Sequence, residues 1–246
     1  MIIEILAATV LVSLLSLIGV VLLPLGKKRV EQVVFIIVSF ATGSLFAAAF
    51  FDLFPEAMEG LETDIVFAWA LAGIVTLFVL ERIIHWHHEH HDHLKHEKPV
   101  AYMVLLGDGI HNFFDGVAIA ASFLTSFELG LTTTIAIVLH EIPQELSDFT
   151  LLLYAGFSRE KALAANILSA LAAVAGALSF LYLTDVVEGL EFYGLAFTAG
   201  IFLYIAGTDL LPEMHKEEKK AKTVVQLIAL LAGILIMWFV IKTLGV

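Results

Sequence analysis

The sequence contains no cysteine, and lysine and arginine together number only 13 in 246 residues. The absence of cysteine excludes disulfide bonds, thiolate metal ligands and cysteine nucleophiles. Charged residues make up 15% of the chain, whereas hydrophobic residues make up 60% and the mean hydropathy is +0.95. Soluble domains contain about 45–50% apolar residues. The sequence therefore predicts a membrane protein, and we expect no nucleic-acid partner.

Long uncharged runs recur along the chain, each near the roughly 20 apolar residues that cross a hydrocarbon core about 30 Å thick. They lack the alternation of barrel strands, so we expect helices. We predict an all-α integral membrane protein, with residues 1–246 as a single transmembrane domain. The first run lacks the basic region of a signal peptide and is expected to remain in the mature protein. The eight predicted spans are Ile2–Leu25, Val33–Phe54, Ile65–Ile84, Val100–Leu124, Leu129–Tyr154, Ala162–Thr184, Phe192–Leu211 and Thr223–Ile241.

The basic residues are distributed unevenly between the loops. All of them except Lys242 lie at the end of an odd-numbered predicted span or in the loop that follows it. The positive-inside rule assigns these loops to the cytoplasm, so both termini are expected outside. The opposite loops carry acids without bases, which either concentrate cations at the outer surface or are simply solvated.

Two segments of the chain resemble each other. FATGSLFAAAFFDLFPEAM (Phe40–Met58) and FTAGIFLYIAGTDLLPEM (Phe197–Met214) align without gaps from their first phenylalanine to a shared DLxPE ending. Their spans run in opposite directions, as in transporters built from inverted repeats, although chance similarity between apolar helices is the alternative. We therefore predict that spans 1–3 and 6–8 are inverted repeats around spans 4 and 5. Two acidic pairs would mark the mouths of a central pathway: Asp52 and Glu56 outside, Asp209 and Glu213 inside.

Spans 4 and 5 carry polar residues near the membrane midplane, with no lysine or arginine at that depth. An uncompensated carboxylate there costs several kcal/mol, so water, protons or bound cations must balance the charge. Imidazole, carboxylate and amide ligands suit zinc, iron(II), manganese or cobalt. Pro143 interrupts span 5, as is common in helices that line ion sites. Helical periodicity places each set on one face of its span: Asp108, His111, Asn112 and Asp115, and His140, Glu141, Gln144, Glu145 and Asp148.

Two other functions are compatible with parts of this pattern. HEIPQ resembles the HExxH motif of an intramembrane zinc protease, but Gln144 replaces the second histidine and Pro143 breaks the helix that the motif requires. We therefore expect no enzymatic activity. A proton-driven metal exporter remains open, because chains of Asp and Glu also relay protons.

The motifs HNFFDG on span 4, HEIPQE on span 5 and FTAGIFLYIAGTDLLPE on span 7 resemble the ZIP family of divalent-metal transporters, in a branch with HNxxD and HExPxE motifs. The resemblance covers essentially the whole chain. It implies eight spans in a 3+2+3 arrangement, both termini outside, a homodimer, and import of zinc, iron or manganese into the cytoplasm. The short loops are typical of a prokaryotic member in the plasma membrane.

The resemblance also implies a midplane site for two metal ions bridged by Asp115. One ion would be held by His111, Asp115, His140 and Gln144, and the other by Asn112, Asp115 and Glu141. Gln144 stands where one branch of the family has a histidine. Further candidate ligands or pathway residues are Asp108, Glu145 and Asp148, and further candidate substrates are cobalt and cadmium.

A predicted cytoplasmic loop at residues 85–98 is rich in histidine, and neutral imidazoles on such a segment bind borderline metals. It is interpreted as a low-affinity metal receiver or sensor below the inner mouth, with a polar linker as the alternative. The sequence thus predicts an importer of divalent metal, zinc foremost, whose partners are lipid and metal ions. The loop histidines are His85, His87, His88, His90, His91, His93 and His96.

Overall fold

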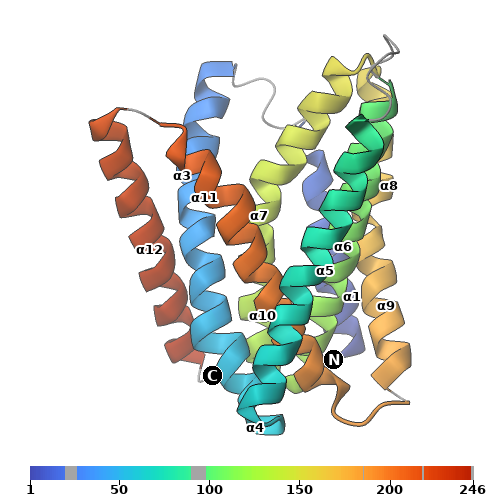
Figure 1. Cartoon of the computed structure of the whole chain (residues 1–246), viewed down its shortest axis with the longest axis vertical. Helices are drawn as coiled ribbons and strands as arrows, with labels where there is room; N and C mark the ends of the chain where they lie inside the picture. The colour runs from blue at the N-terminus through green and yellow to red at the C-terminus, as the bar shows by residue number, and fades with distance from the viewer. Residues whose placement is uncertain (20–26, 90–97, 185, 218, 245–246) are drawn as a thin grey trace.

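The computed structural model describes residues 1–19, 27–89, 98–184, 186–217 and 219–244 (Figure 1). These residues form helices and short turns without any strand, which confirms the predicted all-α class. The elements are α1 (Ile2–Ser13), η1 (Leu14–Leu17), α3 (Lys27–Ala48), η3 (Ala49–Leu53), α4 (Phe54–Gly60), α5 (Thr63–Glu89), α6 (Lys98–Thr125), α7 (Phe127–Tyr154), α8 (Arg159–Ala170), α9 (Ala172–Thr184), α10 (Leu190–Tyr204), η4 (Ile205–Leu210), α11 (Leu211–His215) and α12 (Lys220–Leu244).

Within the described residues, 5 helices are long and apolar enough to cross a membrane. Large apolar side chains such as Phe78 and Leu235 are exposed on their outward faces, as expected for contact with lipid. The helices α6 and α7, which carry the polar residues of predicted spans 4 and 5, are not among the five, and the apolar helix Ile2–Leu17 is shorter. The structure therefore fits an integral membrane protein, while the count of eight spans stays a prediction.

The two repeated sequence segments have the same local structure. The helix α3 passes through the π-helix η3 into α4, and α10 passes through the π-helix η4 into α11. Each π-helix ends just before the proline of the DLxPE ending, Pro55 or Pro212, where the missing backbone N–H disturbs the hydrogen-bond ladder. The two segments run in opposite directions (Figure 1). A shared irregularity at equivalent positions favours a true repeat over chance similarity.

Helix packing follows the same repeat, because α3 packs against α12 and α10 packs against α5. Glycines lie where these helices cross. A Cβ atom added at Gly43 would lie 2.1 Å from the carbonyl oxygen of Leu230, and one added at Gly200 would lie 1.9 Å from that of Ala70. The backbones of each pair therefore touch, as small residues allow in membrane helices.

A second irregularity relates the remaining helices of the two repeats. The helix α1 ends at Ser13, and α8 ends at Ala170, at the same offset that relates the DLxPE segments. The Ser13 hydroxyl donates to the carbonyl oxygen of Ala170 at 2.7 Å. Equivalent points of the two predicted repeats therefore meet in the interior of the bundle.

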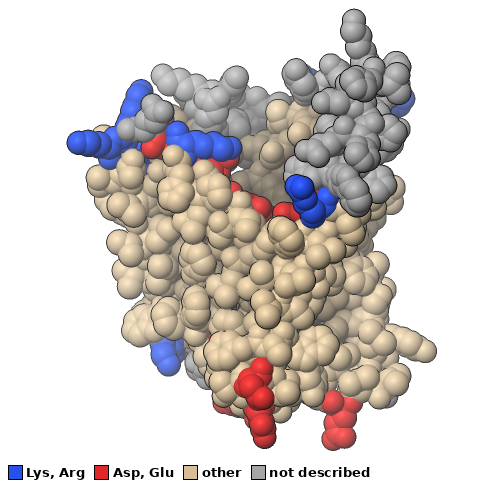
Figure 2. Space-filling model, viewed as in Figure 1, with Lys and Arg blue, Asp and Glu red and all other residues tan. Residues whose placement is uncertain are grey.

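The two polar helices lie between the repeats, because α6 contacts α7, α9 and α10, and α7 contacts α3. Lysine and arginine gather at one end of the molecule and acidic side chains project from the other (Figure 2). The start of α1 and the end of α12 lie at the end opposite the main basic group (Figures 1 and 2). This arrangement agrees with the predicted orientation, whose assignment to the two sides of a membrane rests on the positive-inside rule.

The predicted histidine-rich loop is partly helical. The helix α5 continues past Ile84 to Glu89, so His85, His87 and His88 belong to its last turns, and α6 begins at Lys98. The other four histidines of the loop lie outside the described residues: His90, His91, His93 and His96.

We expect Gly200→Ala to lower the thermal unfolding temperature of the detergent-purified protein by several degrees. The added methyl would collide with the Ala70 carbonyl, and overpacking typically costs about 1–3 kcal/mol. The matched control is Gly207→Ala, where an added Cβ meets nothing within 4 Å. Equal unfolding temperatures for the two variants would contradict the close crossing.

Candidate metal site

The polar faces of α6 and α7 meet inside the bundle. His111 and Asp115 of α6 and His140 and Glu141 of α7 each offer one ligand atom, and these four atoms lie within 4.8 Å of one another. The helical spacing explains this meeting, because residues three or four positions apart share a helix face. The structure thus brings together four of the six ligands that the family resemblance implies.

The two imidazoles face each other through their Nε2 atoms, which lie 3.2 Å apart. The Nδ1 atom of His140 lies 3.1 Å from the carbonyl oxygen of Ala136. Because a carbonyl only accepts, Nδ1 carries the proton and the lone pair of Nε2 faces the group. The carboxylates complete the group: His111 Nε2 lies 3.4 Å from Glu141 Oε1, and His140 Nε2 lies 3.5 Å from Asp115 Oδ2.

These carboxylates are buried and largely unpaired. Asp115 is 1% exposed and Glu141 is 0% exposed. Oδ2 of Asp115 and both carboxylate oxygens of Glu141 accept no hydrogen bond. Among the described residues, lysine pairs with acids only at the surface, at Glu213 and Glu217. The buried negative charge therefore needs a proton or a cation to balance it.

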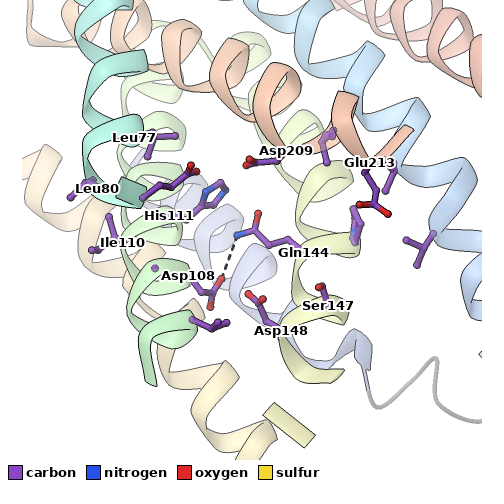
Figure 3. A pocket seen from close by; sticks show the side chains of 17 residues that line it. Leu77, Leu80, Asp108, Ile110, His111, Gln144, Ser147, Asp148, Asp209 and Glu213 are labelled. Atoms are coloured by element: carbon purple, nitrogen blue, oxygen red, sulfur yellow. Dashed lines mark hydrogen bonds between the residues drawn. The ribbon is translucent and has the colours of Figure 1, made fainter. Parts of the chain in front are cut away.

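The two predicted amide ligands are turned toward Asp108 instead. Nδ2 of Asn112 donates to Asp108 Oδ1 at 3.0 Å, and Nε2 of Gln144 donates to the same oxygen at 3.5 Å (Figure 3). Oδ1 of Asn112 is buried without a partner, so it still offers an oxygen ligand. Asp108 also belongs to a second group, in which it meets Glu141 and Glu145 within 4.8 Å.

A cavity of about 480 Å³ leads from the site toward the basic end of the molecule. Polar side chains from α6, α7, η4 and α11 surround it (Figure 3). Its lining includes His111, and also Asp209 and Glu213 of the predicted inner mouth, which are exposed. Figure 2 shows a hollow at this end with acidic side chains at its wall. The polar lining includes Asp108, His111, Gln144, Ser147, Asp148, Asp209 and Glu213.

The predicted outer mouth is closed in this structure. Asp52 is only 1% exposed and accepts a hydrogen bond from the Thr132 hydroxyl of α7, so η3 is held against α7. Glu56, one turn later, is half-buried. The cavity that reaches the histidine group opens toward the basic end instead. The role of Asp52 and Glu56 as an outer mouth stays a prediction.

Sequence reasoning missed several residues around the path. Glu81 of α5 lines the cavity and accepts a hydrogen bond of 2.6 Å from the Tyr204 hydroxyl of α10. Asn166 of α8 donates to Glu145, and Thr132 donates to Asp52. The signal for Glu81 was an acidic residue within predicted span 3. The other three missed residues, Tyr204, Asn166 and Thr132, are of types that occur in ordinary helices and gave no signal.

The family profile described as ZIP Zinc transporter matches residues 2–100 and 85–241. The chain belongs to the ZIP zinc transporter family. This membership confirms the family, while the branch with HNxxD and HExPxE motifs stays a prediction. It is consistent with the expectation of no enzymatic activity, since the relatives are transporters.

Curated relatives support the same conclusion. The chain is 38% identical over 217 residues to zinc transporter ZIP13 of Pongo abelii, covering 82% of this chain and 65% of that protein. It is 29% identical over 307 residues to the zinc transporter ZIP13 homolog of Drosophila melanogaster, covering 94% and 86%. Against zinc transporter ZIP10 of Danio rerio, identity is 41% over 145 residues, and only 17% of that protein is spanned. All three relatives are animal proteins, so the prokaryotic source stays a prediction.

We expect His140→Ala to weaken the binding of the first equivalent of zinc by at least about tenfold. Changing a residue that only supports a metal ligand already costs about 10–100-fold in affinity, and loss of a ligand should cost no less. The measurement is competition with a zinc-sensitive dye in detergent. The matched control is His215→Ala, which removes an exposed histidine at the end of α11. Unchanged affinity in His140→Ala would exclude this imidazole as a ligand.

Proposed function

We propose that the protein carries divalent transition-metal cations through the membrane into the cytoplasm, with zinc as the foremost substrate. The observation that carries the proposal is the buried group of two imidazoles and two carboxylates between α6 and α7, which adjoins a cavity open to the basic end. The relatives bear the name zinc transporter, which supports zinc as the metal.

The ligand set suits a transported rather than a permanently bound ion. Imidazole and carboxylate together suit zinc, iron(II), manganese, cobalt and cadmium. Copper(I) prefers thiolate ligands, and the chain contains no cysteine. A conducted ion must bind well enough to enter and weakly enough to leave. Mixed nitrogen and oxygen ligation with carboxylate oxygens free of hydrogen bonds meets both requirements.

The proposed route follows the acidic residues of the two repeats. A cation is captured near Asp52 and Glu56, bound between α6 and α7, and released through the cavity past Asp209 and Glu213. We propose a two-metal midplane site on this route, with the histidine-rich segment as the receiver. The eight-span topology with both termini outside, the homodimer and the plasma-membrane location belong to the same proposal.

We expect Asp115→Ala to abolish zinc flux into proteoliposomes that contain a fluorescent metal indicator. The variant loses the carboxylate that lies 3.5 Å from His140 Nε2, whereas the control Glu62→Ala removes an exposed acid outside the helices. Manganese, iron(II) and cadmium are tested in the same vesicles to rank the substrates.

Saturable flux in the wild type and in Glu62→Ala, together with its loss in Asp115→Ala, would support the transporter. Flux through Asp115→Ala close to the wild type, at equal reconstitution, would refute the role of this carboxylate. Flux that runs only outward and requires an opposing proton gradient would replace import by proton-coupled export.

A further inference from the structure

We propose that Asp108, Glu141 and Glu145 form a second cation position made of oxygen ligands alone, which takes a harder divalent cation such as Mn²⁺ beside the histidine group. One carboxylate oxygen of each residue lies within 4.8 Å of the others, and all three side chains are buried. The inference rests on the proposed binding of divalent metal. It differs from the family-derived second ligand set, which joins Glu141 to Asn112 and Asp115.

Unpaired oxygens in this group indicate a missing ligand. Glu141 is 0% exposed, and neither of its carboxylate oxygens accepts a hydrogen bond. Oδ2 of Asp108 and Oε1 of Glu145 also lack a hydrogen-bond partner. Three carboxylates this close repel one another in a medium of low dielectric constant. Lysine and arginine make no ion pair with them among the described residues, so a divalent cation would supply the missing charge.

Two of the three carboxylates are already held in position by buried amides. Nδ2 of Asn112 donates to Oδ1 of Asp108 at 3.0 Å, and Nδ2 of Asn166 donates to Oε2 of Glu145. Each amide occupies one oxygen of its carboxylate and leaves the other oxygen free. Outer hydrogen bonds of this kind orient the ligands of metal sites. Because Asn166 lies on α8, the carboxylates and their amide partners together join three helices rather than two.

The group lies on the proposed route of release. Asp108 comes before His111 on α6, and Glu145 comes one turn after Glu141 on α7. Asp108 is therefore nearer the start of α6, and Glu145 is nearer the end of α7. These two helix ends lie at the same end of the bundle (Figure 1). Asp108 also points into the cavity beside Gln144 (Figure 3). A cation that leaves the histidine group toward the basic end therefore meets this group next.

Glu141 belongs to both groups, so a cation can pass from one to the other without losing all of its protein ligands. The chemical difference between the groups gives them different preferences. Imidazole nitrogen favours zinc, whereas Mn²⁺ and other hard cations favour carboxylate oxygen. We infer that the oxygen group binds Mn²⁺ even when the imidazoles are removed.

The experiment measures the affinity of the full chain in detergent for Mn²⁺, by electron paramagnetic resonance of the free ion, and for zinc, by dye competition. Glu145→Gln and Asp108→Asn retain an acceptor oxygen for their amide partners but remove charge. Each should weaken Mn²⁺ binding by at least about tenfold while retaining zinc at the histidine group. His140→Ala should show the reverse, and Glu160→Gln, which removes an exposed acid at the start of α8, should leave both affinities unchanged.

Retained zinc binding in Glu145→Gln and Asp108→Asn also shows that these variants fold. Wild-type Mn²⁺ affinity in Glu145→Gln and Asp108→Asn would overturn the inference. So would an equal loss of Mn²⁺ and zinc affinity in these two variants. A loss of Mn²⁺ affinity in His140→Ala as large as in Glu145→Gln would also overturn it. Because binding is measured at equilibrium without vesicles, a failure of the flux assay leaves this result unaffected, and a failure here leaves the transport proposal to that assay.

Discussion

Unbalanced negative charge inside an apolar bundle is the constraint on which this structure depends. Asp108, Asp115, Glu141 and Glu145 are all buried, and the lysine ion pairs of the described residues lie at the surface. Burying such carboxylates without a counter-charge would cost more than a marginally stable protein retains on folding. Their presence is understandable only if cations or protons regularly occupy the space between them.

The rest of the fold can be understood as the frame that holds these groups in place. Glycine crossings bring α3 against α12 and α10 against α5 at backbone distance, which leaves little freedom for these pairs to separate. The polar helix α6 packs against α9 by the same kind of crossing, because a Cβ atom added at Gly116 would lie 1.8 Å from the carbonyl oxygen of Ala173. The other polar helix, α7, is also attached by polar contacts, such as the bond between Thr132 and Asp52. Packing by backbone contact is insensitive to protonation and metal, whereas the polar contacts respond to both. The two kinds of contact therefore differ in how they react to the substrate.

The helical class and the shared face of His111 and Asp115 could be predicted from the sequence because hydropathy and the 3.6-residue period are local properties. The inverted DLxPE segments could be aligned for the same reason, and Pro55 and Pro212 signal an irregular helix, although not its π form. The contact of Gln144 with Asp108 and that of Tyr204 with Glu81 could not be predicted. Each depends on the rotation of one helix against another, which is set by packing across the whole bundle. Glu145 could be placed on the polar face, but its amide partner on α8 could not.

The contact between Ser13 and Ala170 has a consequence for how such a molecule can be assembled. These positions are equivalent in the predicted repeats, yet one supplies the donor hydroxyl and the other the accepting carbonyl oxygen. A dimer of two identical half-length chains would place the same side chain at both positions, so neither position could change without the other. Joining both halves in one polypeptide removes that restriction, and each half can then specialise where it meets the other.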